Sequence, residues 1–354
     1  MSAKASLGLS TAGLFWVVLL CCGCLVRAPR PRAAGERHRE FLERGRVTAK
    51  THAIRQDLLD RFETWLTPQL PGCSIELLAR NHIDVLCEWL EEYMTSMYLT
   101  GQSRRAASET LNALAQRYGW LRFSLAGPWN LIRTWEGLEP VQHHPPMPLP
   151  VLRALVTTAL VWDWPKLAVL LVLGFFGLLR PSELIGLRRR DLSLPDDHLG
   201  GDVIHIRVGT PKTRNKAARS QHVRVDEVGV AAWVQMMIAS VPMWRRIWNG
   251  SWAAFKHRFD LLQFEVVERK VFLPSSLRPG GATYLFRLWD ENLPRLQWRG
   301  RWRWFRMLEI YVQELGAAEI LIRFPPGVRR KVGFLGGCFV EILSACCLGT
   351  ANGC

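Results

Sequence analysis

Between residues 51 and 140, apolar side chains recur at the three- and four-residue spacing of amphipathic helices. Such stripes cross residues 54–62, 83–93 and 106–118, and Pro and Gly residues separate them. The pattern predicts a bundle of about four helices. The polar segment 141–146, which ends in two prolines, predicts a linker after this bundle.

A second domain is expected from 148 to 324, with a different hydrophobic pattern. Residues 167–179 are almost wholly apolar, but they are fewer than the roughly 20 residues that span a bilayer. We therefore expect them to form a buried central helix. Further helices are expected at 152–161, 233–238, 255–264, 283–288 and 308–315.

Two short segments of this domain alternate between apolar and polar side chains. Residues 202–208 and 221–225 have this period of two, which is typical of strands with one buried face. A Lys- and Arg-rich turn separates them, so they predict a β-hairpin. Together the patterns predict a mainly α fold with a small β-hairpin or sheet (α+β). A helical N-terminal bundle would precede a mixed, mostly helical second domain.

Residues 1–50 and 325–354 flank these two domains. The first segment contains an apolar run at 12–26, followed by an arm rich in Arg and Pro that we expect to be flexible. The apolar run is short for a membrane span and fits a signal-peptide core or an N-terminal anchor better. The second segment is rich in Gly and Cys, and its pattern assigns no element.

The charge of the chain favours polyanionic partners. The 354 residues carry a formal net charge of +15, which points to nucleic acid or an acidic membrane face. A solvated basic surface explains that charge equally well. Of nine Cys residues only Cys73 and Cys87 lie in the central stretch, and no pair has zinc-finger spacing. The sequence therefore predicts no metal site and a reduced environment, nucleus or cytoplasm, with membrane contact only through residues 12–26.

Several residues of the second domain have the chemistry that cleavage of a phosphodiester requires. Its non-bridging oxygens carry a negative charge, which two guanidinium groups can clamp through paired hydrogen bonds. Arg180 and Arg278 are the candidates, because each follows an apolar run or a Leu, at the expected end of an element. Glu183 lies three residues after Arg180, on one face of a helix that Pro181 would begin, and can orient that guanidinium. Taken singly, each is more simply an ordinary surface residue.

Three further residues complete this chemistry. Lys212, in the turn of the predicted hairpin, can protonate the leaving oxygen, and Lys216 competes for that role. Trp302 offers an indole N–H to a phosphate oxygen, and Tyr311 offers a phenol whose nucleophilic form nearby guanidinium groups favour. The alternatives are a solvated basic turn, a core Trp and a buried Tyr on an amphipathic helix. Contacts to DNA are expected from Arg214, Lys216, Arg299, Arg301 and Arg303.

The order and spacing of these residues resemble the signatures of the tyrosine recombinase (phage integrase) family. The first signature, Gly-Leu-Arg-hydrophobic-Ser-Glu-Leu followed by Leu and Asp, is similar to GLLRPSELIGLRRRD at 177–191, with one extra residue after the Gly. The second, His-x-Leu-Arg-His-x-x-Ala-Thr, is similar to SSLRPGGAT at 275–283. The third, Leu-Gly-His with the nucleophile nine residues later, corresponds to GRW at 300–302 and to Tyr311. Trp is an accepted family alternative to that His.

The resemblance implies a catalytic domain at 148–324 and, in the helices at 51–140, a core-binding domain that clamps the far side of a DNA duplex. Ser275 stands where the family usually has His or Lys, and Pro279 where a His is common. A complete clamp and nucleophile with weakened proton handling is therefore implied. The implied catalytic residues are Arg180, Lys212, Ser275, Arg278, Trp302 and Tyr311.

Enzymes of this family break and rejoin DNA through a 3′-phosphotyrosyl intermediate, without a metal, ATP or another cofactor. The resemblance therefore implies recombination or integration, for instance by a transposable element. The implied partners are double-stranded DNA and identical chains in a tetrameric synapse. Three alternatives stay open: a catalytically inactive descendant that only binds DNA, an enzyme that relaxes supercoils by the same chemistry, and a basic protein anchored to a membrane through residues 12–26.

Overall fold

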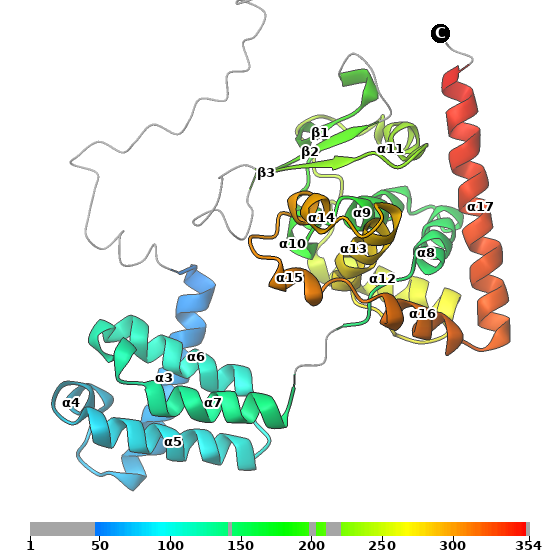
Figure 1. Cartoon of the computed structure of the whole chain (residues 1–354). Helices are drawn as coiled ribbons and strands as arrows, with labels where there is room; N and C mark the ends of the chain where they lie inside the picture. Colours follow the sequence, from blue (N-terminus) through cyan, green and yellow to red (C-terminus); the bar gives the residue numbers. More distant parts are fainter. Residues whose placement is uncertain (1–46, 141–143, 198–202, 210–220, 352–354) are drawn as a thin grey trace, which may run out of the picture. The chain divides into compact units, whose positions relative to one another are not determined.

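The computed structural model describes residues 47–140, 144–197, 203–209 and 221–351. The chain divides into two compact units, Met1–Val141 and Gln142–Cys354 (Figure 1). Each unit has its own hydrophobic core.

The first unit is a helical bundle around a core that includes Phe62, Leu90 and Leu111. The pattern predicted about four helices, and the described residues contain five α-helices. The additional one is a short helix that the Ser74 side chain caps by accepting a hydrogen bond from the Leu77 amide at 3.2 Å. The helices are α3 (Ala49–Gln69), α4 (Ile75–Asn81), α5 (Ile83–Leu99), α6 (Arg104–Arg117), the 3₁₀ helix η2 (Gly119–Phe123) and α7 (Ala126–Leu138).

The second unit packs its helices around the predicted apolar segment. Pro165 begins this central helix, and its side chains from Leu167 to Phe176 are all buried. The α-helices are α8 (Leu149–Val161), α9 (Pro165–Phe176), α10 (Pro181–Gly186), α11 (Val230–Ile238), α12 (Trp252–Val267), α13 (Leu277–Leu288), α14 (Leu293–Gly300), α15 (Arg306–Glu309), α16 (Glu314–Ile322) and α17 (Pro326–Ala351). Short 3₁₀ turns occur at η3 (Arg189–Asp191), η4 (Pro195–Asp197) and η5 (Pro274–Ser276).

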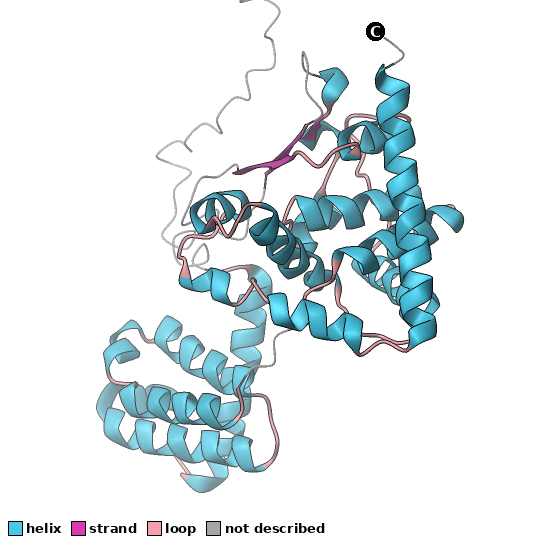
Figure 2. Ribbon diagram, turned by 45° about the vertical axis from the view of Figure 1, so that its right-hand side comes forward, coloured by secondary structure: helices cyan, strands magenta, loops and turns pink. Residues whose placement is uncertain are grey.

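A small antiparallel sheet, magenta in Figure 2, accompanies these helices. Its strands lie in the order β1-β2-β3. The predicted pair of strands is confirmed as β2 (Ile204–Val208) and β3 (Gln221–Val225), with Ile206 opposite Val223. Strand β1 (Leu192–Ser193) was not predicted, because two residues are too few to show an alternating pattern. The mainly α fold with a small sheet is therefore confirmed. The turn residues Lys212, Arg214 and Lys216 lie outside the described residues.

The C-terminal segment, to which the sequence pattern assigned no element, forms the long helix α17 beside α8 (Figure 1). The Thr157 hydroxyl donates to the Leu335 carbonyl at 2.7 Å, and the Phe339 ring meets the buried Trp233 edge to face. Apolar contact with α8 and α11 thus stabilises the helical conformation of a segment whose Gly residues have low helix propensity. None of the described helices is long and apolar enough to cross a bilayer, and residues 12–26 lie outside the described part.

Close packing of α13 places the start of that helix in the centre of the unit. A Cβ atom on Gly281 would stand 2.0 Å from the Phe175 carbonyl oxygen, and one on Gly280 would stand 2.2 Å from that of Met147. Only glycine permits these approaches. They hold Arg278, in the first turn of α13, in the interior of the unit.

Candidate functional site

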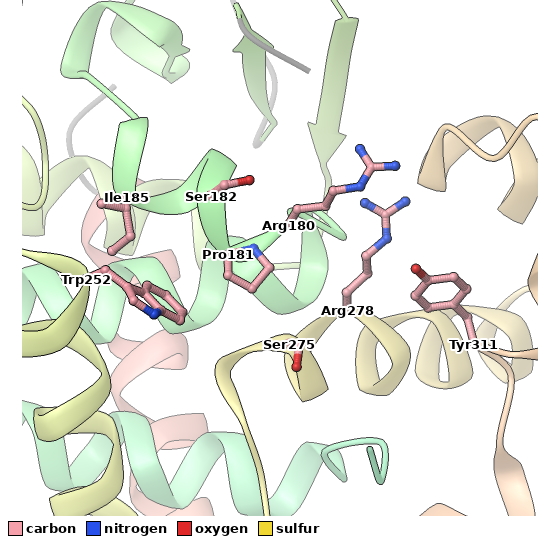
Figure 3. Close-up of a pocket in the computed structure, with 8 residues that line it drawn as sticks. All are labelled: Arg180, Pro181, Ser182, Ile185, Trp252, Ser275, Arg278 and Tyr311. Carbon is pink, nitrogen blue, oxygen red and sulfur yellow. The ribbon is translucent and has the colours of Figure 1, made fainter. Parts of the chain in front are cut away.

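A pocket of about 730 Å³ opens where α10, α12 and α13 meet the Tyr311 segment (Figure 3). It brings together four of the six residues predicted to be catalytic, namely Arg180, Ser275, Arg278 and Tyr311. Of the other two, Trp302 lies against Arg278 and Tyr311 without lining the pocket, and Lys212 is outside the described residues. The remaining lining residues are Pro181, Ser182, Ile185 and Trp252.

Arg180 is the N-cap residue of α10, as predicted from Pro181, which favours the first turn of a helix. Its backbone N–H donates to Oε2 of Glu183 at 2.9 Å, and its Nη1 donates to Oε1 at 3.0 Å. Glu183 is thus in the position to orient this guanidinium that the three-residue spacing suggested. Its side chain is only 3% exposed, so the carboxylate depends on these partners in place of water.

Arg301 was expected to contact DNA, but its guanidinium turns inward and binds Glu183. Nη2 donates to Oε2 of Glu183 at 2.8 Å, and Nη1 donates to Oε1 at 3.3 Å. Nη2 also donates to the Leu178 carbonyl and Nη1 to the Gln221 side chain, each at 3.3 Å. Arg301 ends α14 in a left-handed conformation, with φ of 59°. One buried carboxylate therefore holds two arginines, Arg180 and Arg301.

The Arg299 guanidinium likewise binds a carboxylate of the protein. Its Nη1 and Nη2 donate to Oδ1 of Asp226 at 3.0 Å each, and Nη2 donates to Oδ2 at 2.9 Å. Internal carboxylates thus bind the guanidinium groups of Arg299 and Arg301, and the DNA contacts expected of these two residues stay predictions. Arg303 is exposed over the Trp304 ring, 5.0 Å from its centroid, and remains a candidate.

Arg278 is the most deeply buried charged group of the site, at 2% exposure. Its Nη2 donates to the Gly300 carbonyl at 2.6 Å. The guanidinium carbon lies 4.8 Å from the ring centroid of Trp302 and 5.4 Å from that of Tyr311. These contacts fix the plane of the guanidinium, because both rings attract the cation through their faces.

The charge on Arg278 persists despite this burial. Removal from water lowers the pKa of Arg278 to about 9, and the positive charges of Arg180 and Arg301 act in the same direction. Tyr311 and Glu183 oppose this effect. Because the lowered pKa still lies above neutrality, the group remains a cation at neutral pH, in a place where an anion would be strongly attracted.

Several buried donors at this site have no hydrogen-bond partner. Among the described residues six buried side-chain polar atoms are unsatisfied, and four of them belong to this cluster. They are Nε and Nη1 of Arg278, Nε of Arg301 and Nε1 of Trp302. Buried donors are normally satisfied, so this group of unpartnered donors is unusual, and two of the four atoms belong to Arg278, which lines the pocket.

The Trp302 ring packs against Arg278 and Tyr311, with its centroid 5.0 Å from that of the Tyr311 ring. The indole packs directly on Gly300, where a Cβ atom would lie 1.6 Å from the ring. Gly300 is therefore required both for this close packing and, through its carbonyl, for holding Arg278. Trp302 supports the cation and the phenol in their observed positions.

Tyr311 does not lie on a helix, which corrects the helix predicted over 308–315. Helix α15 ends at Glu309 and α16 begins at Glu314, so Tyr311 lies in the turn between them. The Thr283 hydroxyl holds this turn, donating to the Tyr311 carbonyl at 3.3 Å and accepting from the Gln313 amide at 3.1 Å. Figure 3 shows the phenol oxygen directed towards the Arg278 side. The helical spacing misled because the Gln313 amide donates to the Thr283 hydroxyl and not to a backbone carbonyl one turn earlier.

Ser275 lies in the 3₁₀ turn η5 just before α13 and lines the pocket below Arg278 (Figure 3). Its hydroxyl can donate or accept a hydrogen bond, but it cannot act as a base near neutral pH. Trp252 is a pocket residue that sequence reasoning missed, because one Trp among 16 carries no positional signal. Among the described residues, no group of His, Cys, Asp or Glu side chains is arranged to hold a metal ion.

The buried Glu183 predicts a particular dependence of stability on pH. Burial alone would raise the pKa of Glu183, but the hydrogen bond and charge of Arg301, with those of Arg180, outweigh it and place the pKa below 4.5. In acid the unfolded chain then binds more protons than the folded protein. The stabilisation by ionised Glu183 is therefore complete above pH 4.5 and is lost as the pH falls through the lower pKa of Glu183 in the folded protein. We expect Glu183→Gln to flatten the slope of unfolding free energy against pH, measured by urea denaturation.

The exposed ion pair between Glu319 and Arg323 supplies the matched control for this titration. Because the Glu319 side chain is 43% exposed, Glu319→Gln should leave the slope close to that of the wild type. A wild-type slope in Glu183→Gln would contradict the assigned charge network.

Comparison with solved structures identifies the architecture. The Tn1549 transposon integrase, in complex with transposon right end DNA, matches with a TM-score of 0.56 and 15% identity, over 80% of this chain and 96% of that one. The chain has a recombinase-like fold. XerH site-specific recombinase bound to its difH substrate matches in the pre-cleavage complex with a TM-score of 0.50, 14% identity and coverages of 76% and 78%. A post-cleavage complex of XerH with palindromic difH matches at 0.52, with 12% identity and 77% of each chain.

At these identities the likeness to the recombinases concerns the fold alone. No protein-family model matches the sequence, and no curated protein matches it. The recombinase-like fold is the one that the signatures at 177–191, 275–283 and 300–311 implied. What the pocket does must therefore be argued from the side chains that line it.

Proposed function

We propose that this protein breaks and rejoins DNA through a covalent tyrosine intermediate, in the manner of tyrosine recombinases and integrases. The observation that carries the proposal is the convergence of Arg180, Arg278 and Tyr311 on one pocket, in which Arg278 has two donors without a partner. A phosphodiester supplies the two acceptor oxygens and the negative charge that such a site lacks. The recombinase-like fold supports the same conclusion.

The proposed reaction is an in-line displacement at phosphorus. The phenol oxygen of Tyr311 attacks, the bond from phosphorus to the 5′ oxygen breaks, and the electron pair of that bond passes to the departing oxygen. The phenol proton is lost to solvent and the departing oxygen gains a proton, which leaves a 3′-phosphotyrosyl bond and a 5′-hydroxyl. Arg180 and Arg278 hold the two non-bridging oxygens, an electrostatic contribution of typically 10²–10³ in rate per donor.

Proton delivery is the step for which this chain differs most from the family pattern. Ser275 occupies the position of the usual His or Lys and offers only a neutral hydroxyl. Lys212 is the proposed acid for the 5′ oxygen, with Lys216 as the competing residue of the same turn. We therefore propose a slower enzyme whose rate depends on the hairpin turn more than on Ser275.

Arg180 owes its position in this proposal to Glu183 and Arg301. The carboxylate accepts from both guanidinium groups, so Arg301 keeps Glu183 in place and Glu183 orients Arg180. Two cations sharing one carboxylate leave a net positive charge beside Arg278. That charge favours the phosphate over a neutral ligand.

Double-stranded DNA is the proposed partner, and the complexes of XerH with difH substrate and of the Tn1549 integrase with transposon right end DNA support this proposal. We propose that residues 51–140 clamp the duplex on the side away from the catalytic unit, and that four identical chains assemble on two duplexes for strand exchange. Recombination or integration, for instance by a transposable element, is the proposed biological reaction. It would take place where DNA is found, in the nucleus or the cytoplasm.

The test is capture of the covalent adduct from DNA of random sequence, which requires no assumption about the target. Full-length protein is incubated with a pool of random-sequence duplexes, each with one nick on the 3′ side of the position to be cut, so that a short 5′-hydroxyl fragment diffuses away. Detergent denaturation then isolates DNA joined to protein. We expect enriched sequences and, after proteolysis, a nucleotide on the peptide that contains Tyr311.

Absence of any adduct would overturn the enzymatic proposal. If salt-sensitive DNA binding nevertheless persisted, the protein would be an inactive binding descendant, because phosphate contacts set the salt dependence. An enzyme that forms the adduct and relaxes supercoiled plasmid without exchanging strands would be a relaxing enzyme instead.

A further inference from the structure

The pocket has two walls of different chemistry. Arg180, Arg278 and Tyr311 form a wall suited to a phosphate, whereas Pro181 and Trp252 form an apolar one together with Ile185 (Figure 3). Pockets of a few hundred Å³ and more hold ligands of drug size. At about 730 Å³, this pocket has room for much more than a phosphate group. Both walls line the same pocket, so a ligand whose phosphate lies at the arginines can also reach the apolar wall.

Trp252 is held as a fixed plane on the apolar wall. It is the first residue of α12, directly after the N-cap Ser251, whose hydroxyl accepts from the Ala254 amide at 3.1 Å. Its ring stacks on the fully buried Phe255, with centroids 5.7 Å apart and planes at 17°. The side chain nevertheless remains 43% exposed. An exposed aromatic ring anchored on a buried one is a suitable platform for another flat ring.

The direction of the reaction places one particular nucleotide beside this platform. In a phosphoryl transfer, the attacking and leaving oxygens lie roughly in line on opposite sides of phosphorus. In Figure 3 the side chains of Arg180 and Arg278 stand between Tyr311 and Trp252. If the phosphate lies at the arginines and Tyr311 attacks from one side, the leaving 5′ oxygen faces Trp252.

We propose that Trp252 stacks against the base of the nucleotide that leaves with the 5′-hydroxyl, and so retains that end for rejoining. This inference rests on the proposed function, since it assigns the apolar half of the same pocket. Every base has a π face, so the contact tolerates any sequence. Pro181 and Ile185 complete an apolar surface around the base. A retained 5′ end shortens the search that religation requires.

The experiment separates rejoining from cleavage. The covalent adduct is first formed on a nicked duplex recovered from the random pool, and an acceptor strand with a 5′-hydroxyl is then added. Acceptors are identical except that the first nucleotide carries either its base or no base. We expect the wild type to rejoin the intact acceptor roughly tenfold faster, as for the loss of one aromatic stacking partner. In Trp252→Ala both acceptors should react at the same slow rate.

Trp298→Ala supplies the matched control, because Trp298 is 87% exposed on α14 and does not line the pocket. It should discriminate between the acceptors as the wild type does, and Trp252→Phe should retain part of the discrimination. Equal discrimination in Trp252→Ala and wild type would overturn the inference while leaving the proposed function intact. Failure to form any adduct would overturn the proposed function itself.

Discussion

Tyr311→Phe is expected to abolish the covalent adduct while leaving DNA binding in place. The change removes one oxygen and keeps the ring, which packs against Trp302 and lies under the Arg278 guanidinium. Loss of a nucleophile typically costs several orders of magnitude, so the adduct should fall by at least about 10⁴-fold. Denaturing electrophoresis of radiolabelled DNA measures the adduct, and binding titrations in rising salt measure the affinity.

Tyr284→Phe provides the matched control for this experiment. The Tyr284 hydroxyl donates to the Glu227 carboxylate at 2.9 Å, and burial with the adjacent negative charge raises the pKa of this phenol well above its usual value. Such a phenol is a poor nucleophile and does not line the pocket of Tyr311. Adduct from Tyr311→Phe at the wild-type level, or its loss in Tyr284→Phe alone, would remove Tyr311 from the reaction.

The sequence predicted the elements whose hydrophobic period is local. The apolar run at 167–179 became the buried helix α9, and the alternating segments became β2 and β3. The cap position of Arg180 also followed from local chemistry, because Pro181 suits the first turn of a helix and Glu183 reaches back to the cap. These features depend on residues only a few positions apart in the chain, so the local sequence pattern is sufficient to predict them.

Features that depend on distant partners were not predictable from the pattern. Arg301 looks like the other arginines of its segment, but a buried carboxylate far away in the chain turns it inward. Tyr311 has helical spacing, but Thr283 holds it in a turn. The role of Trp252 required the pocket itself. In each case a tertiary contact outweighs the local preference, which is small per residue.

Arg278→Lys is expected to slow adduct formation by about 10²–10³, although it preserves the charge. The reason is the planar geometry of the guanidinium group, whose nitrogens donate hydrogen bonds in fixed directions. Nη2 of Arg278 donates to the Gly300 carbonyl, and Nε and Nη1, which lie on different edges of the guanidinium, have no partner among the described residues. A lysine has one nitrogen, which cannot donate both to the Gly300 carbonyl and to a phosphate oxygen from the separate edges that a guanidinium offers. Single-turnover rates on the nicked duplex measure the effect.

The matched control is Arg295→Lys, because Arg295 is exposed on α14 and lies over the Trp289 ring, 4.2 Å from its centroid. This change also replaces a guanidinium beside an aromatic ring by an ammonium, but outside the pocket, so the rate should stay within a factor of about two. DNA affinity should change little in either variant, since many phosphate contacts contribute to it. If Arg278→Lys reacted at the wild-type rate, positive charge alone would be sufficient at this position. The several hydrogen-bond donors of the Arg278 guanidinium would then have no part in holding the phosphate.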